Sequence, residues 1–196
     1  MAAQADLIVR NGTVITADTT FEADLAIRDG TFVAIAAPGE LGMTAAEDFD
    51  ARGLHVLPGV IDGHVHFRDP GFEYKEDWST GSTAAVMGGV TTVLDMPNTN
   101  PQTKDPEAAL VKKQIAEQKS WCDFGFIGLL VSENVDQLRP LGEQGLVVGF
   151  KAFLGITIGA IPAPHDGAIL DGMREIAAMG MRLGFHAENK DRKSVV

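Results

Sequence analysis

The stretch "VIDGHVHFRDPG", residues 60–71, begins with the branched apolar residues of a buried strand and ends in charged and polar ones. Side chains alternate between the two faces of a strand, so Asp62, His64 and His66 are expected on one face. Their spacing puts the two imidazoles about 6–7 Å apart, close enough to converge on one metal ion. Zinc commonly binds imidazole nitrogen, and Asp62 could orient one of its ligands from behind.

Segments typical of strands and helices alternate from residue 54 onward. Such alternation predicts parallel β/α units with a sheet buried on both faces. The predicted strands are 55–66, 90–96, 122–131, 146–155 and 181–189, and the predicted helices are 74–89, 106–119, 134–145 and 168–180.

Residues 1–53 have a different character, with short β-rich runs separated by turn dipeptides. Asn11-Gly12 and Asp29-Gly30 supply the positive φ that tight hairpin turns require. The sequence therefore predicts a small β-sandwich segment over 1–53, followed by a β/α domain over 54–196.

Polar residues recur at the ends of the predicted parallel strands. His64 and His66 end the first, Asn98 follows the second, Lys151 lies in the fourth and His186 in the fifth. Parallel sheets carry their chemistry at the carboxyl ends of strands, in barrels and open sheets alike. This agreement favours a metal site over a pair of structural histidines.

Lys151 lies in the apolar strand "VVGFKAFLG", where an unpaired ammonium is costly. One interpretation is a lysine that extends its amine out of the strand end into water. The other is a lysine modified by carbon dioxide, whose anionic carbamate can bridge two cations. The residues alone leave both open.

Arg68 and Asn98 are candidates for substrate binding. Arg68 follows His66 by two residues, and a guanidinium at that rim is suited to a two-pronged contact with a carboxylate. Asn98 lies in the loop "MPNTNP" and could donate to the same group. A surface arginine and a turn asparagine remain equally open. His55 and His165 have no partner in the sequence and are interpreted as structural.

Composition excludes several classes of protein. The net charge of −11 argues against a surface for nucleic acid or anionic membranes. The single cysteine excludes an internal disulfide framework and fits a cytoplasmic protein. We find no secretory signal and no apolar run near the roughly 20 residues that cross a bilayer.

Four motifs resemble the cyclic amidohydrolases of the amidohydrolase superfamily. They are "PGVIDGHVHFRDPG", "EYKEDWSTGSTAAVMGGVTTVLDMPNTNP", "GFKAFLG" and "HAEN", in the family's order. The resemblance implies a (β/α)8 barrel preceded by a β-sandwich segment, with two zinc ions at the barrel mouth. His64 and His66 would bind one ion, His186 the other, and carboxylated Lys151 would bridge them. The two cations would lower the pKa of a bound water that hydrolyses a ring amide.

Within this family the motifs "HFRDPG", "YKED" and "MPNTNP" look most like dihydroorotase, in which Arg68 and Asn98 would hold the substrate carboxylate. The reaction would be the reversible hydrolysis of dihydroorotate to N-carbamoyl-aspartate, a step of pyrimidine biosynthesis. "GFKAFLG" and "HAEN" are at least as similar to allantoinases and to hydantoinases or dihydropyrimidinases, which are the alternative. The partner expected is a small cyclic amide.

The chain accounts for only part of such a barrel, which takes about 250 residues. Five strands and four helices are predicted, and the family's Asp at strand eight, a metal ligand and general acid/base, would lie beyond Val196. We therefore expect this chain to be a segment of a longer, homo-oligomeric parent protein, and to be inactive by itself. The ending "RKSVV" has no counterpart in the family.

Two rival classes follow from the same residues. A non-catalytic scaffold homologue would commonly lose metal ligands, whereas every ligand expected within this span is present. An open nucleotide-binding α/β protein would carry Gly-x-Gly-x-x-Gly after its first strand, and the sequence has none there.

Overall fold

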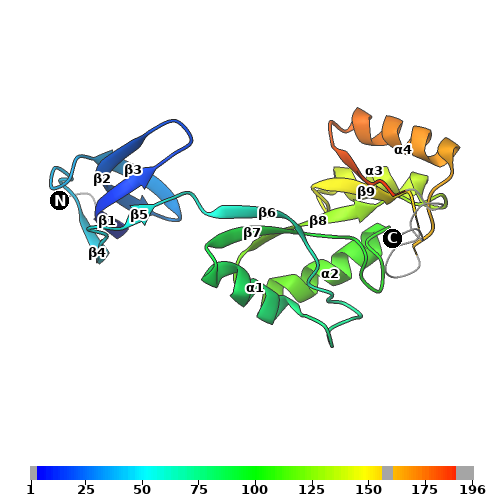
Figure 1. Cartoon of the computed structure of the whole chain (residues 1–196), viewed down its shortest axis with the longest axis horizontal. Coiled ribbons are helices and arrows are strands. Elements are labelled where there is room, and N and C mark those ends of the chain that lie inside the picture. Colours follow the sequence, from blue (N-terminus) through cyan, green and yellow to red (C-terminus); the bar gives the residue numbers. More distant parts are fainter. Residues whose placement is uncertain (1–3, 156–160, 189–196) are drawn as a thin grey trace. The chain divides into compact units, whose positions relative to one another are not determined.

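The computed structural model describes residues 4–155 and 161–188, and the chain divides into two compact units, Met1–Pro58 and Gly59–Val196. Figure 1 shows a unit of strands alone and a unit in which strands and helices alternate. The predicted end of the last strand at Asn189 and the ending 192–196 lie outside the described residues.

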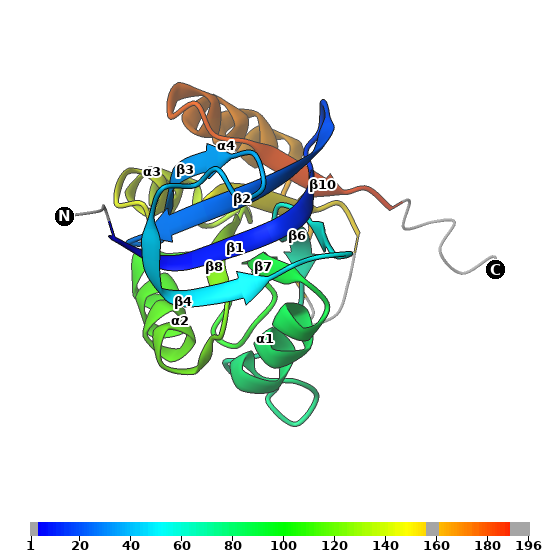
Figure 2. The same cartoon turned by 90° about the vertical axis from the view of Figure 1, so that its left-hand side faces the viewer.

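The first unit contains one mixed five-stranded sheet in the order β3-β2-β1-β4, with β5 also paired to β1 (Figure 2). β1 is antiparallel to β2 and parallel to β4 and β5. The strands are β1 Gln4–Ile15, β2 Thr20–Arg28, β3 Thr31–Ala36, β4 Thr44–Asp50 and β5 His55–Val56.

Only one of the two predicted hairpin turns is a turn. Asp29 and Gly30 have φ angles of 51° and 69° and connect β2 to β3. Asn11, with φ 57°, instead lies inside β1, where the register with β2 shifts between Val9 and Gly12. A β-bulge, like a turn, uses a left-handed residue, so the Asn-Gly dipeptide does not by itself distinguish the two.

The strand predicted over 55–66 is two strands. β5 pairs with β1, whereas β6, Val60–Val65, pairs with β7 of the second unit. Pro58 lies between them, and proline cannot donate the backbone hydrogen bond that a continuous strand needs.

The second unit is a five-stranded parallel sheet with the strand order β10-β9-β8-β7-β6. Consecutive strands are neighbours, so the order never reverses as it does in an open dinucleotide-binding sheet. A helix separates each pair, which is the arrangement of a (β/α)8 barrel. After β6 the elements are α1 Trp78–Met87, β7 Val90–Asp95, α2 Pro106–Lys119, β8 Asp123–Leu129, α3 Val135–Glu143, β9 Gly149–Phe153, α4 Asp166–Ala178 and β10 Leu183–His186.

Side-chain caps explain where the first two helices begin. Asp77 accepts a hydrogen bond from the Thr80 amide, so α1 begins at Trp78, four residues after the start predicted at residue 74. Asp105 accepts from the Ala108 amide, and Pro106 occupies the first helical position of α2, as predicted.

The core between the sheet and its helices centres on Trp78, which is completely buried. Its ring lies 5.0 Å from that of Phe67 in an edge-to-face contact, and Phe124 and Phe126 are also in contact with it. Its indole N–H donates to the Asp69 carbonyl at 3.0 Å. The aromatic cluster thus packs the loop after β6 against the sheet.

No helix in the described part of the chain is long and apolar enough to cross a membrane.

We predict that Asp24→Ala selectively destabilises the first unit. Asp24 is buried and accepts hydrogen bonds from the amides of Asn11, at 2.8 Å, and Gly39, at 3.0 Å. Leaving both amides unpaired should cost about 2–3 kcal/mol. The measurement is hydrogen exchange of β1 and β2 amides, with fluorescence of Trp78 and Trp121 as an internal reference for the second unit.

The effect of Asp24 should depend on pH. Desolvation by burial raises the pKa of Asp24, but its hydrogen bonds and Arg10 outweigh this and hold the pKa below its usual value. The stabilisation should therefore be complete above about pH 4 and decline as the pH falls through the lowered folded-state pKa. Asp48→Ala, which removes an exposed partner of Arg10, is the matched control, and an equal loss in both variants would contradict the prediction.

Candidate active site

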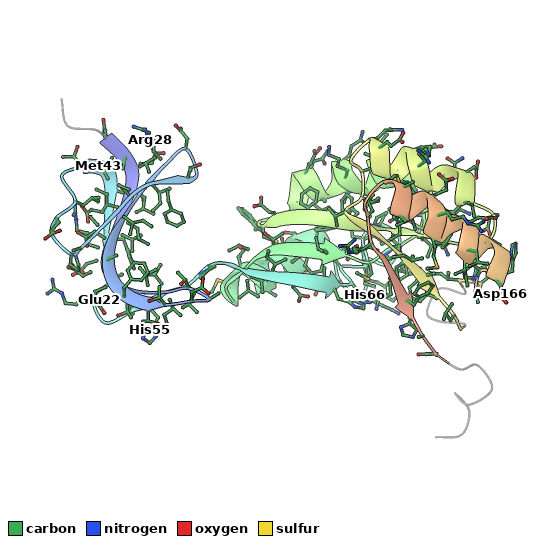
Figure 3. The ribbon with its side chains drawn as sticks, turned by 90° about the horizontal axis from the view of Figure 1, so that it is seen from above. Glu22, Arg28, Met43, His55, His66 and Asp166 are labelled. Atoms are coloured by element: carbon green, nitrogen blue, oxygen red, sulfur yellow. The ribbon has the colours of Figure 1, made fainter. Side chains whose placement is uncertain are left out.

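The two histidines of the His-x-His motif lie side by side at the end of β6. Their ring centroids are 5.3 Å apart, and Figure 3 shows His66 at the strand end. The strict alternation expected from residue 62 to 66 does not hold, because the register with β7 shifts between Asp62 and Val65. One extra residue on β6 forms an irregularity there, yet the two imidazoles remain neighbours.

Lys151 reaches this histidine pair from β9. Its side chain is 8% exposed, and Nζ lies 3.3 Å from Nε2 of His64 and 3.5 Å from Sδ of Met96. The amine therefore does not extend out of the strand end into water, which was one of the two interpretations of the sequence. It lies instead against a predicted metal ligand.

His186 joins His64 and Lys151 along one cleft of about 540 Å³ on the sheet. His186 ends β10, and its Nε2 lies 2.6 Å from Oε1 of Glu188. Strands β6, β9 and β10 thus bring together three of the four predicted metal ligands, His64, Lys151 and His186, with His66 beside His64.

The electrostatic surroundings of His64 and His66 favour the neutral form of both imidazoles. Desolvation by burial and the charge of Lys151 lower the pKa of His64. Desolvation and then Arg68 lower the pKa of His66, outweighing the opposite effect of Asp95. Burial likewise lowers the pKa of Lys151. A neutral imidazole is the form that binds a metal ion.

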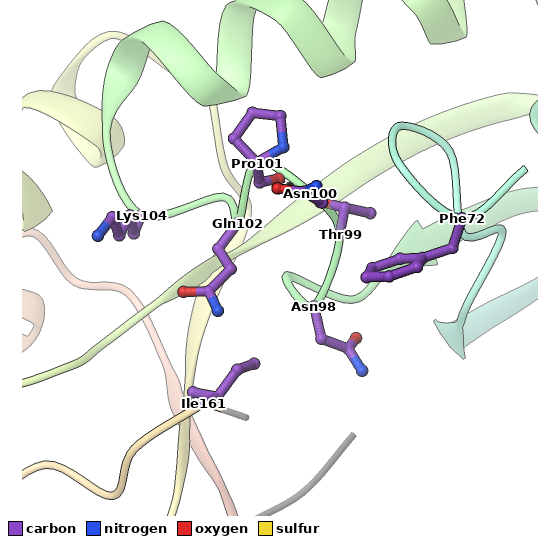
Figure 4. A pocket seen from close by; sticks show the side chains of 8 residues that line it. All are labelled: Phe72, Asn98, Thr99, Asn100, Pro101, Gln102, Lys104 and Ile161. Atoms are coloured by element: carbon purple, nitrogen blue, oxygen red, sulfur yellow. Dashed lines mark hydrogen bonds between the residues drawn. The ribbon is translucent and has the colours of Figure 1, made fainter. Parts of the chain in front are cut away.

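Arg68 and Asn98 both lie near His66, in two different loops. Arg68 has a φ of 64°, and its charge contributes to the lowered pKa of His66. Asn98 is 6% exposed, and its Oδ1 is buried without a hydrogen-bond partner among the described residues. Figure 4 shows the Asn98 amide pointing into a pocket of about 390 Å³, between Phe72 and Ile161.

Asp62 is exposed, and its Oδ1 accepts a hydrogen bond from the His64 backbone amide at 3.1 Å. Its charge raises the pKa of His64, opposing the larger effect of burial. Asp62 therefore contacts the backbone of a predicted ligand and influences its ring through charge.

Sequence reasoning missed a buried ion pair directly behind His66. Lys112 and Asp95 are 1% and 0% exposed, and Nζ lies 2.6 Å from Oδ2. A signal was present in the sequence. Lys112 lies four residues after Ala108 and four before Ala116, so it shares a helix face with these two buried alanines. A lysine within an apolar helix face indicates a buried partner.

The chemistry of the donor set restricts what metal the site can hold. Within residues 4–155 and 161–188, no three His, Cys, Asp or Glu side chains gather closely enough to hold an ion by themselves. A metal at the end of β6 therefore needs a different ligand as well, and Lys151 is the side chain placed to supply one. An ammonium has no lone pair, so Lys151 can serve as a ligand only as its neutral amine or after a modification that adds a donor atom.

Comparison with known proteins finds a match to the model of the amidohydrolase family over residues 55–195. Similar curated proteins include an allantoinase of Desulfitobacterium hafniense (strain Y51), 44% identical, and an L-hydantoinase of Paenarthrobacter aurescens, 36% identical. These alignments cover 95% and 94% of this chain but only 41% and 40% of the relatives, so the chain spans about two fifths of their length.

Similar solved structures include an L-hydantoinase (dihydropyrimidinase) from Arthrobacter aurescens, with a TM-score of 0.90 and 35% identity over 95% of this chain and 42% of that one. A D-hydantoinase from Thermus sp. matches with a TM-score of 0.81 and 32% identity over 94% and 41%. The predicted fold, the N-terminal part of a (β/α)8 barrel preceded by a β segment, is confirmed. With motifs, strand order and a family match over 55–195 in agreement, this chain belongs to the amidohydrolase family.

Proposed function

We propose that this chain carries metal-binding and substrate-binding residues of a cyclic amidohydrolase of the allantoinase or hydantoinase type. The observation that carries the proposal is the approach of Lys151 Nζ to within 3.3 Å of His64 Nε2, with the His66 ring beside that of His64 and His186 along the same cleft. Family membership and the names of the relatives support the reaction class.

His64, His66, His186 and carboxylated Lys151 would hold two zinc ions. Carboxylation joins the neutral Lys151 amine to carbon dioxide through a new N–C bond and releases one proton, giving a carbamate whose single negative charge is shared by two oxygens. The desolvated position of Lys151 supports this role, because burial favours its neutral amine. When bound, the two ions would lower the pKa of a water and polarise a ring carbonyl.

Arg68 and Asn98 would bind and orient the ring. Both lie close to His66 in different loops, so each could donate to a ring bound at this strand end. The buried Oδ1 of Asn98 offers an acceptor for a ring N–H. Asp62 would keep the His64 backbone in place through its hydrogen bond.

A dihydroorotase activity is the second candidate. The convergence of Arg68 and Asn98 on His66 suits a ligand with a carboxylate, because a guanidinium holds a carboxylate with two hydrogen bonds. The relatives named above are allantoinases and hydantoinases, so the first candidate has the stronger support.

We predict that Lys151→Ala abolishes metal loading and turnover. The test protein is a chimaera in which this chain replaces the matching segment of the Desulfitobacterium hafniense allantoinase. Intact mass should show one added carbon dioxide on the parent and none on Lys151→Ala, and elemental analysis should show zinc lost with it. Propionate should restore part of the turnover by supplying a carboxylate. Lys113→Ala, which changes an exposed lysine, is the control. Full zinc content in Lys151→Ala would refute the assignment.

A substrate panel separates the two candidate activities. We expect allantoin or a hydantoin to be hydrolysed and dihydroorotate to be poor. Arg68→Ala should lower kcat/KM about 10- to 100-fold, the loss expected when a charged hydrogen-bond donor is removed. A second chimaera, completed from the Paenarthrobacter aurescens L-hydantoinase, identifies preferences that this chain itself carries. Efficient dihydroorotate turnover in both chimaeras, lost in Arg68→Ala, would establish the second candidate instead.

A further inference from the structure

The ion pair between Lys112 and Asp95 is the most deeply buried charge cluster among the described residues. Three oxygens surround Nζ of Lys112: Asp95 Oδ2 at 2.6 Å, the Met96 carbonyl at 2.9 Å and Thr103 Oγ1 at 3.4 Å. The ring of Phe126 lies beneath the ammonium, 5.2 Å away. Lys112 is therefore held by an ion pair with Asp95 and by hydrogen bonds to the Met96 carbonyl and Thr103 Oγ1.

Asp95 connects this ion pair to the backbone next to the predicted metal ligand His66. While Oδ2 faces Lys112, Oδ1 accepts a hydrogen bond from the Phe67 backbone amide at 2.8 Å. Phe67 directly follows His66. The carboxylate thus connects α2 to the backbone of β6 immediately beyond its second histidine.

His66 is held on both sides by this arrangement. The carbonyl before it, that of Val65, accepts from the Met96 amide at 3.0 Å, which is the last backbone bond between β6 and β7. The amide after it, that of Phe67, is held by Asp95. Because the register of β6 against β7 is already irregular, the regular ladder does not by itself fix this residue.

Burying an ion pair costs desolvation free energy, and here the pair provides a hydrogen-bond acceptor for only one backbone amide. Desolvating two charges commonly offsets most of their attraction, so an apolar pair of similar shape would serve stability equally well. What the charges add is orientation. A carboxylate has two equivalent acceptors, so whichever oxygen the ammonium holds, the other faces Phe67.

We propose that Lys112 and Asp95 are positioning residues that fix the strand end at His66 for metal binding. Lys112 orients Asp95, Asp95 holds the Phe67 amide, and the held backbone sets the direction of the His66 ring. Partners of this kind change metal affinity by about 10- to 100-fold. The metal part of this proposal rests on the proposed function, whereas the hold on Phe67 does not.

The test uses the whole 196-residue chain labelled with ¹⁵N. The variant Lys112→Met keeps the length of the side chain and removes its charge. We expect the Phe67 amide to exchange with solvent about tenfold faster than in the parent, relative to β8 and β9 amides. Titration of the metal-free Desulfitobacterium hafniense chimaera with Co²⁺, followed by visible absorption, should show an affinity about 10- to 100-fold lower when it carries Lys112→Met.

Three further variants separate positioning from general stability. Lys113→Met removes an exposed neighbour on α2 and should change neither readout. Leu138→Ala, in the core under α3, should speed exchange of many amides without singling out Phe67. The double variant Lys112→Met with Asp95→Leu carries no unpaired buried charge, so its urea midpoint should lie above that of Lys112→Met alone. Phe67 exchange and Co²⁺ affinity should stay impaired, because a leucine side chain cannot accept the hydrogen bond of the Phe67 amide.

Parent-like Phe67 exchange in the double variant would overturn the proposal, as would equal effects of Leu138→Ala and Lys112→Met on that amide. If the unsubstituted chimaera binds no Co²⁺, the ligand role of His66 fails as part of the proposed function. The positioning claim is then decided by Phe67 exchange alone.

Discussion

The pairing of β6 to β10 in chain order is the constraint on which the second unit depends. Parallel neighbours joined by helices must all end at the same edge of the sheet. His64, Lys151 and His186 are 122 residues apart from first to last in the sequence (186 − 64), yet they meet along one cleft. The site is thus a product of strand order, and no local sequence motif contains it.

The elements that the sequence predicted well are those with local causes. Asp105 and Pro106 mark the start of α2, and the branched residues of 90–96 mark β7, because capping and β-propensity act over a few neighbouring residues. The placement of His64, Lys151 and His186 followed from one further rule, the location of chemistry at carboxyl ends of strands.

What the sequence did not predict depends on contacts between distant residues. The bulge at Asn11 exists because its amide meets the carboxylate of Asp24 on the neighbouring strand. The irregularity in β6 is defined against β7, and the pairing of Lys112 with Asp95 needs α2 packed on the sheet. A periodicity of two or of 3.6 carries no information about such partners.

Family membership and substrate choice differ in how they are encoded. The residues at the strand ends suit hydrolysis of many cyclic amides, because each such substrate presents the same ring carbonyl. In the proposed function, Arg68 and Asn98 would face the part that differs between those substrates, and two side chains are too few to separate a carboxylate from a ring amide. The similarity to allantoinases and hydantoinases therefore says more about substrate class than the motif "HFRDPG" does.

The bridge from Lys112 through Asp95 to Phe67 also bears on protein engineering. Barrels of this kind are often regarded as series of exchangeable β/α modules. Here the first module supplies His66 and Phe67, while the second supplies Asp95 and Lys112. Grafting β6 and its loop into another barrel would leave the strand end without its anchor. The smallest segment that could be transplanted with the backbone beside His66 still held in this way is therefore a pair of consecutive β/α modules.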